Sequence, residues 1–199
     1  MKVIGISGNA TVGKDSLCTE LKTLLEEDYN YQTCRFAFAD KLKKEVDNFL
    51  LETLGISAFT QNPKEKEIIR PFLVWWGTEF RRKNDKNHWI DQIENNMKFI
   101  HSLEEAENSE TIFVITDVRY KNEFDWIKSF DNGCTIFLDR YDKNMNLIQP
   151  GNEYEERNNK WLRDTADIKF VWQTVDDESY KKRFIKRNNI IKEIESHLV

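Results

Sequence analysis

The residues with the clearest chemical spacing are 8–14, which read G-N-A-T-V-G-K and match the pattern G-x-x-x-x-G-K. They stand between an expected apolar strand, residues 3–7, and an expected helix that begins at Lys14. In that context the glycines let backbone N–H groups turn toward a phosphate, and the helix start adds a favourable partial charge. Lys14 would bridge the β- and γ-phosphates of a nucleoside triphosphate. The expected triphosphate contacts are Gly8, Asn9, Ala10, Val12, Gly13, Lys14, Asp15 and Ser16.

The residue after the lysine departs from the usual pattern. Asp15 stands where Ser or Thr ordinarily binds Mg²⁺. Ser16 comes next and could supply the hydroxyl ligand, while Asp15 could hold a metal-bound water. The alternative is an ordinary glycine-rich turn, with Lys14 solvated at the start of a helix. The order of strand, loop, lysine, hydroxyl and helix favours a phosphate site with Mg²⁺.

A second polar group follows the strongest expected strand, residues 111–116, which is a continuous apolar run. Asp117 and Arg119 come directly after it, and open parallel sheets bind ligands at the carboxyl ends of their strands. Asp117 could orient Mg²⁺ or accept a hydrogen bond from the phosphate loop. Arg119 could bind a substrate phosphate bidentately, which suits arginine better than lysine. The alternative is a surface ion pair.

Two adjacent arginines, Arg81 and Arg82, end the stretch G-T-E-F-R-R. On a helix they would point roughly 100° apart, so one could face a substrate phosphate while the other is solvated. We favour Arg81 for that role, although both could be solvated. Trp76, beside Trp75, could stack on a base or fill the core.

The expected elements alternate strands with helices, which is typical of a mostly parallel sheet covered on both faces. We expect strands at residues 3–7, 33–37, 111–116, 134–138 and 168–172. Helices are expected from Lys14, at 40–54, at 64–80 with an interruption near Pro71, after Asn87, at 121–130 and as one C-terminal helix. Residues 141–160 are polar and predict a loop or flap. The predicted fold class is α/β, a P-loop fold with a five-stranded, mostly parallel sheet flanked by helices.

Composition limits the function classes. The chain has 199 residues, of which 39% are hydrophobic and 33% charged, as in a folded soluble protein. Its net charge of −5 counts against stable nucleic-acid binding. The three scattered cysteines lack metal-ligand spacing and predict small buried side chains in a reducing compartment. The short apolar start does not predict a signal peptide, and no stretch predicts a membrane span, so we expect a cytoplasmic protein.

Four stretches together resemble the bacteriophage deoxynucleoside monophosphate kinases. They are G-K-D-S at the end of residues 8–16, F-A-D-K-L-K at 38–43, G-T-E-F-R-R at 77–82 and T-D-V-R-Y-K-N-E at 116–123. The resemblance covers about residues 1–50 and 70–140. It implies a fold like adenylate kinase, with ATP in the phosphate loop facing a monophosphate, and in that family an aspartate after the lysine is normal. Phosphomevalonate kinases share the G-K-D and D-x-R features, so the acceptor is less specified than the phosphoryl transfer.

The resemblance also implies residue roles. Lys14 and Ser16 would bind the triphosphate and Mg²⁺, with Asp117 beside the metal. Arg140, at a strand end, would serve the transferring phosphoryl group or else be solvated. The predicted catalytic residues are Lys14, Asp117, Arg119 and Arg140. The residues predicted to bind the acceptor are Asp40, Lys43, Trp76, Arg81, Arg82 and Arg119. The residues predicted to bind the metal are Ser16, Asp15 and Asp117.

The predicted function is ATP- and Mg²⁺-dependent phosphorylation of a (deoxy)nucleoside monophosphate. We expect a single domain over residues 1–199, with an acceptor-binding helical region at about 40–105 and a lid at about 141–165. The expected partners are small-molecule nucleotides, with no membrane, and the chain would be a monomer or homodimer, in the host cytoplasm if viral. The alternatives are a kinase for another phosphorylated small molecule, such as phosphomevalonate, a P-loop ATPase coupled to nucleic acid, or a nucleotide-binding regulatory module.

Overall fold

The computed structural model describes residues 1–107, 110–150, 153–174, 178–187 and 189–198. The chain forms two compact units: unit 1 comprises Met1–Phe36 and Ile100–Val199, and unit 2 comprises Ala37–Phe99. The predicted single domain, with its acceptor region at 40–105, stays a prediction. Within the described ranges, no helix combines the length and apolar character needed to cross a membrane.

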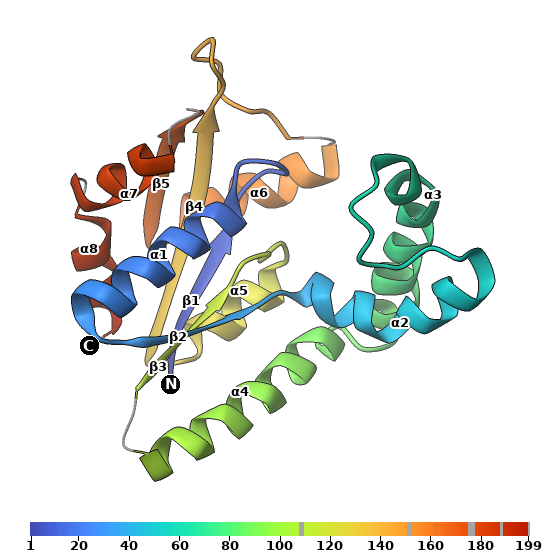
Figure 1. Cartoon of the computed structure of the whole chain (residues 1–199), viewed down its shortest axis with the longest axis horizontal. Coiled ribbons are helices and arrows are strands. Elements are labelled where there is room, and N and C mark those ends of the chain that lie inside the picture. Colours follow the sequence, from blue (N-terminus) through green and yellow to red (C-terminus); the bar gives the residue numbers. More distant parts are fainter. Residues whose placement is uncertain (108–109, 151–152, 175–177, 188, 199) are drawn as a thin grey trace. The chain divides into compact units, whose positions relative to one another are not determined.

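Unit 1 is built on a five-stranded sheet in which every neighbouring pair runs parallel. The strands are β1 (Lys2–Ser7), β2 (Gln32–Phe36), β3 (Thr111–Ile115), β4 (Asn132–Tyr141) and β5 (Ile168–Gln173). Their order across the sheet is β2-β3-β1-β4-β5 (Figure 1). Because β1 and β3 are buried on both faces, they are continuous apolar runs rather than alternating ones. The predicted α/β class with a parallel five-stranded sheet is confirmed.

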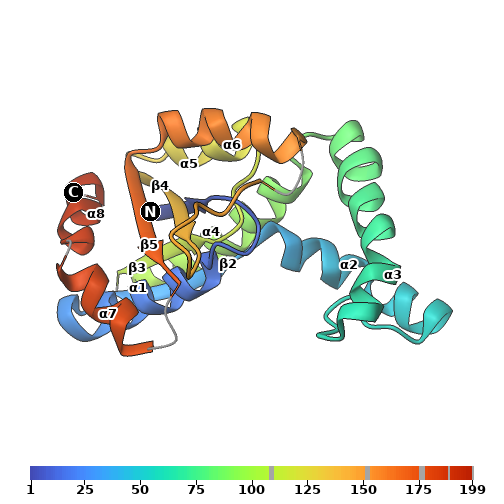
Figure 2. The same cartoon turned by 90° about the horizontal axis from the view of Figure 1, so that it is seen from above.

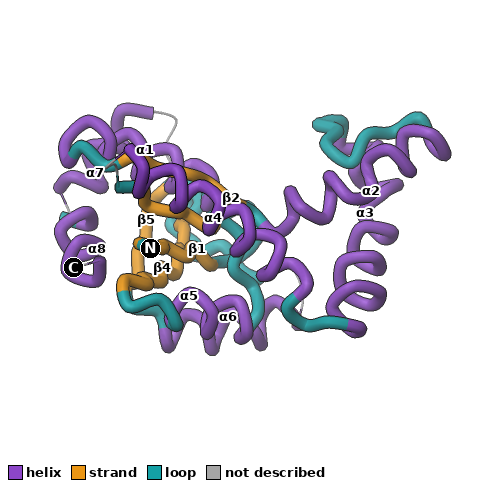
Figure 3. The backbone as a smooth tube through the Cα atoms, turned by 90° about the horizontal axis from the view of Figure 1, so that it is seen from below, coloured by secondary structure: helices purple, strands orange, loops and turns teal. Residues whose placement is uncertain are grey.

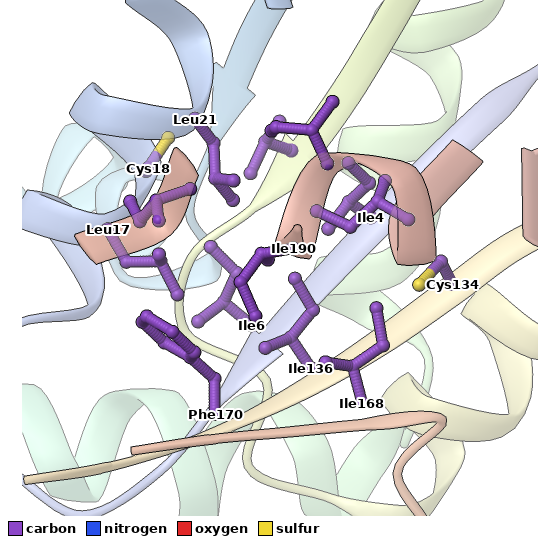
Figure 4. Packing of buried hydrophobic residues seen from close by; sticks show 14 of the residues in the cluster. Ile4, Ile6, Leu17, Cys18, Leu21, Cys134, Ile136, Ile168, Phe170 and Ile190 are labelled. Atoms are coloured by element: carbon purple, nitrogen blue, oxygen red, sulfur yellow. The ribbon is translucent and has the colours of Figure 1, made fainter. Parts of the chain in front are cut away.

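Helices cover both faces of this sheet (Figure 2). On one face lie α1 (Lys14–Tyr29), α7 (Glu178–Arg187) and α8 (Ile190–Leu198), and on the other lie α5 (Lys121–Lys128) and α6 (Glu153–Thr165). The core beneath α1 joins Ile4 and Ile6 of β1 to Leu17 and Leu21 of the helix (Figure 4). This packing fixes the start of α1 over the carboxyl end of β1.

Two of the three cysteines fill that core as predicted, whereas Cys34 of β2 is only half-buried. Cys18 of α1 and Cys134 of β4 are buried. Burial raises the pKa of the Cys18 thiol to about 11 and that of Cys134 to about 12. Both therefore stay protonated near neutral pH and pack as small apolar side chains.

Two predictions about the C-terminal half were wrong. Residues 153–160 belong to α6 rather than to a loop, because Asn159 and Leu162 anchor that helix in the core although most of its residues are polar. Residues 142–150 do lack regular structure beyond one bridge between Tyr141 and Leu147. The expected single C-terminal helix is divided into α7 and α8, and Asn189 has a φ of 54°, which does not continue a right-handed helix.

Unit 2 is helical (Figure 3). It contains α2 (Phe38–Leu54), α3 (Pro63–Val74), the π-helix η1 (Trp75–Arg82) and residues 88–99 of α4 (His88–Glu107). A small core of Val46, Leu50 and Ile69, with Trp76 packed against it, joins α2, α3 and η1. The predicted interruption near Pro71 was wrong: α3 continues through the proline to Val74. The helix instead changes its hydrogen-bonding register at Trp75.

Candidate functional site

The phosphate loop lies at the carboxyl end of the central strand. β1 pairs with β3 on one side and β4 on the other, and it ends at Ser7, directly before the loop. Gly8 has a φ of 140°, and a Cβ there would lie 2.3 Å from the carbonyl oxygen of Leu138. A side chain at Gly8 would therefore strain the backbone and collide with β4. The predicted order of strand, loop and helix is confirmed, with α1 beginning at Lys14.

The strands β4 and β5 hold this loop. Trp172 of β5 donates its indole N–H to the carbonyl of Val12, with 2.8 Å between the heavy atoms. Arg140 of β4 donates from Nη1 to the carbonyl of Thr11 at 3.1 Å and from Nε to the hydroxyl of Thr174 at 2.6 Å. The predicted catalytic residue Arg140 thus lies against the phosphate loop. The side chain of Val12 is buried in the core, so only the backbone of this loop residue can contact a bound phosphate.

Asn9 attaches the loop to the segment predicted as a lid. Its buried amide donates to the carbonyl of Ile148 at 2.9 Å and accepts from Nδ2 of Asn159, on α6, at 2.6 Å. These residues line a cavity of about 340 Å³, whose wall also carries the ion pair between Asp139 and Arg163. Because the side chain of Asn9 makes these two hydrogen bonds, we expect its backbone N–H, and not its side chain, to contact a bound phosphate.

Lys14 curls back over the loop. Its Nζ donates to the carbonyl oxygens of Gly8 at 3.0 Å and Asn9 at 2.9 Å. These bonds hold the ammonium group against the loop backbone. A bound phosphate would accept hydrogen bonds from the ammonium in place of one or both carbonyls. The predicted contact of Lys14 with the β- and γ-phosphates stays a prediction, which the sequence pattern supports.

The two residues after Lys14 differ in their surroundings. Asp15 is exposed, and its Oδ1 accepts hydrogen bonds from Nη2 of Arg35, on β2, at 2.8 Å and from Nε at 3.2 Å. Ser16 is half-buried in the first turn of α1. The predicted role of Asp15 as holder of a metal-bound water therefore competes with its ion pair to Arg35.

Asp117 follows β3 at the same edge of the sheet. The amide of Thr116 donates to the carbonyl of Phe36 on β2, and the amide of Val118 donates to the carbonyl of Ile6 on β1. These two bonds continue the sheet ladder past the end of β3 and fix the backbone on both sides of Asp117. The predicted carboxylate therefore stands beside the strand that carries the phosphate loop.

Arg119 owes its position to Glu123, for which the sequence analysis assigned no role. Glu123 is completely buried, and its Oε2 accepts from the amides of Arg119 at 2.7 Å and Tyr120 at 3.1 Å. A glutamate at the third position of a helix commonly accepts such bonds, so the spacing before α5 could have indicated it. The exposed side chain of Arg119 projects from this braced turn.

Unit 2 carries the predicted acceptor residues. Asp40 and Lys43 lie in the first turns of α2, and the ammonium of Lys43 is 5.6 Å from the ring centroid of Phe59. Trp76, Arg81 and Arg82 all lie on η1, where Arg82 is half-buried.

Glu45 of α2 joins two of these residues, and the sequence analysis did not single it out. Its Oε1 accepts from Nε of Arg81 at 2.6 Å, from Nη2 of the same guanidinium and from Nε1 of Trp76 at 3.0 Å. Its Oε2 lies 3.4 Å from Nε2 of His88. Burial opposes ionisation of Glu45, but the hydrogen bonds from Arg81, Trp76 and His88 outweigh it and lower the pKa of the carboxyl.

The structure gathers the predicted residues in two sets. The carboxyl edge of the sheet in unit 1 carries the phosphate loop, Lys14, Asp117 and Arg140. The helices of unit 2 carry the second set: Asp40, Lys43, Trp76, Arg81 and Arg82. Mg²⁺, which the loop pattern implies, prefers hard oxygen ligands, and the Ser16 hydroxyl and Asp117 carboxylate would provide two of them. The individual roles stay predictions.

Comparison with known proteins found no matching family model and no matching curated protein. Similar solved structures include a shikimate kinase from Aquifex aeolicus, 15% identical with a TM-score of 0.42 over 97% of this chain and 96% of that one. A gluconokinase from Sinorhizobium meliloti is 12% identical, with a TM-score of 0.42 over 99% and 91% of the two chains. A dephospho-CoA kinase from Campylobacter jejuni is 14% identical, with a TM-score of 0.40 over 97% of each. Likeness at this level says nothing of the substrate of this chain.

Proposed function

We propose that the chain is a kinase that transfers the γ-phosphoryl group of ATP, with Mg²⁺, to the phosphate of a nucleoside monophosphate, and that the natural acceptor is a deoxynucleotide. The observation that carries this proposal is the phosphate loop at the carboxyl end of the central parallel strand, with Lys14 folded over it. Asp117 and Arg119 follow the neighbouring strand at the same edge.

The donor half of the proposal rests on unit 1. The loop amides and the start of α1 would bind the β-phosphate, and Lys14 would follow the negative charge that moves during transfer. Arg140, held at Thr11, adds positive charge beside the loop. Mg²⁺, when bound, neutralises charge on the β- and γ-phosphates. Positioning and charge neutralisation of this kind are what phosphoryl transfer requires, and no nucleophilic side chain is needed.

The acceptor half rests on arginines and on sequence resemblance. A monophosphate oxygen is already ionised at neutral pH, so the acceptor needs no strong general base. Arg119, in unit 1, and Arg81, in unit 2, are each proposed to bind the acceptor phosphate, where a guanidinium would offset the repulsion between two polyanions. The four stretches that resemble bacteriophage deoxynucleoside monophosphate kinases support the choice of acceptor.

The test is coupled ADP release with ATP, Mg²⁺ and each common deoxynucleoside or nucleoside monophosphate in turn. We expect turnover that depends strictly on one or a few monophosphates, with deoxynucleotides preferred, and a diphosphate product in equal amount to ADP. Hydrolysis of ATP that no monophosphate accelerates would contradict the proposed acceptor. ATP hydrolysis that DNA or RNA stimulates would instead indicate an ATPase coupled to nucleic acid.

A further inference from the structure

The π-helix η1 places two functional side chains on one face. Its hydrogen bonds run from residue i to i+5, and such helices are rare and frequently lie at functional sites. In an α-helix, residues five apart point about 140° away from each other. In η1, Trp76 and Arg81 are five apart and yet lie together, with the guanidinium carbon of Arg81 5.3 Å from the Trp76 ring centroid. Because the π-helical hydrogen bonds bring residues five apart onto the same face, both side chains can reach Glu45.

Glu45 restrains the Arg81 guanidinium along one edge. Nε and Nη2 both donate to Oε1 of Glu45, which also accepts from the Trp76 indole. Among the described residues, Nη1 of Arg81 has no hydrogen-bond partner. The pair is partly exposed, with 34% of the Arg81 side chain and 20% of the Glu45 side chain accessible to solvent, so a ligand can reach the guanidinium. One edge of the guanidinium is fixed and its other donor remains for a ligand oxygen.

Neighbouring helices lock this arrangement. Gly77 lies so close to α2 that a Cβ there would be 2.2 Å from Cδ1 of Leu42. The carbonyl of Gly77 accepts a hydrogen bond from the indole of the buried Trp89, on α4, at 3.2 Å. Glu45 itself is on α2, so the helix that Gly77 approaches is the helix that supplies the carboxylate.

We propose that Glu45 is a positioning residue that aims Arg81 at the phosphate of the acceptor, and that the π-helical register of η1 exists to build this pair. The proposal rests on the proposed function, since it assigns the acceptor phosphate as the ligand of Nη1. Its physical basis is preorganisation: an arginine already held in one rotamer loses less conformational entropy when a phosphate binds. His88, at the start of α4, also contacts this carboxylate, with 3.4 Å between its Nε2 and Oε2 of Glu45.

A competing interpretation makes the opposite prediction. If Glu45 merely occupied Arg81, its carboxylate would compete with the acceptor phosphate and repel it. Removing the charge would then strengthen acceptor binding. Positioning and competition are therefore distinguished by the sign of the change in KM for the acceptor.

The experiment compares wild type with Glu45→Gln, Arg81→Ala and Trp76→Phe, using the monophosphate that wild type phosphorylates with the highest kcat/KM. We expect Glu45→Gln to raise the acceptor KM about tenfold and Arg81→Ala to raise it further, with the KM for ATP changed less than about twofold. Trp76→Phe keeps an aromatic side chain but removes the indole hydrogen bond to Glu45, so its increase in acceptor KM should be smaller. In the double variant, Glu45→Gln should add little to Arg81→Ala, because the glutamate acts through the arginine.

Asp47→Asn is the matched control for general damage to unit 2. Asp47 is also on α2, and its carboxylate accepts from the hydroxyl of Ser57 at 2.8 Å and the amide of Ala58 at 2.7 Å. This change should lower thermal stability without raising the acceptor KM. If Glu45→Gln is folded and active but its acceptor KM is unchanged or lower, the positioning role of Glu45 is overturned. The proposed function is not affected by that result. Wild type that phosphorylates no monophosphate overturns the proposed function, and this inference with it.

Discussion

At the scale of single residues, Lys14 is the sharpest test of the phosphate site. We expect Lys14→Ala to lower kcat by at least roughly 100-fold, the loss typical when one charge-stabilising donor is removed from a transition state. The Nζ of Lys14 donates to the carbonyl oxygens of Gly8 and Asn9, inside the same loop, so the melting temperature should change little by comparison. Steady-state kinetics and thermal denaturation measure the two effects.

Lys22→Ala is the control for that change. Lys22 is on the same helix, half-exposed, and its Nζ is 3.9 Å from a carboxylate oxygen of Glu26 one turn away. Exposed pairs of this kind contribute little, so activity and stability should both stay near wild type. Full activity in Lys14→Ala would show that the loop does not serve phosphoryl transfer.

At the scale of elements, Asp167 joins α5 to the sheet just before β5. It accepts from Nζ of Lys128 on α5 at 2.9 Å, and from the amide and hydroxyl of Thr135 on β4 at 2.8 and 2.7 Å. Burial opposes its ionisation, but the bonds from Lys128 and Thr135 outweigh this and lower the pKa of Asp167 below its ordinary value of 3.8. The ionised carboxylate therefore stabilises the folded state.

The pH dependence of stability follows from that direction. A pKa that is lower in the folded state contributes stability that is fully present above pH 3.8 and is lost as the pH falls through the lower folded value. Asp167→Asn should therefore lower the free energy of unfolding at pH 7, and its difference from wild type should shrink at the acid end of a denaturation series. A difference that stayed constant down to pH 2 would contradict this assignment.

β5 also supports the phosphate loop, through Trp172. In Trp172→Phe the aromatic packing remains, but the indole hydrogen bond to the Val12 carbonyl is lost. We expect the KM for ATP to rise several-fold, because the loop loses one of its fixed contacts, while the acceptor KM changes little. Initial rates over a grid of both substrates measure the two constants. A change confined to the acceptor KM would show that β5 does not support donor binding.

The elements that could be predicted from the sequence are those whose cause is local or periodic. β3 is a continuous apolar run and the phosphate loop is a glycine pattern, so both could be located before the fold was known. The helix α6 could not, since its few buried residues gain their anchoring from tertiary contacts such as that of Asn159 with Asn9. The π-helical hydrogen bonding of η1 and the role of Glu45 could not be predicted for the same reason. Trp76 and Arg81 share the Glu45 carboxylate only because α2 packs beside Gly77 in the folded chain.

At the scale of the whole molecule, the chain divides its predicted roles between two units. The phosphate loop and Asp117 belong to unit 1, while Trp76 and Arg81 belong to unit 2, whose residues 37–99 form a continuous insertion between β2 and the rest of unit 1. Each unit has its own buried core. Donor and acceptor should therefore stabilise different parts of the backbone when each binds alone.

Hydrogen exchange measured by mass spectrometry tests this division. ATP with Mg²⁺ should slow exchange of the amides in residues 8–16, because the loop N–H groups would become donors to phosphate. The accepted monophosphate alone should slow exchange in η1 and around Glu45, because a phosphate on Arg81 restrains both, and Arg81→Ala should abolish that protection while leaving the ATP effect intact. Protection of residues 8–16 alone by the monophosphate would place acceptor binding in unit 1 and remove the acceptor role of η1.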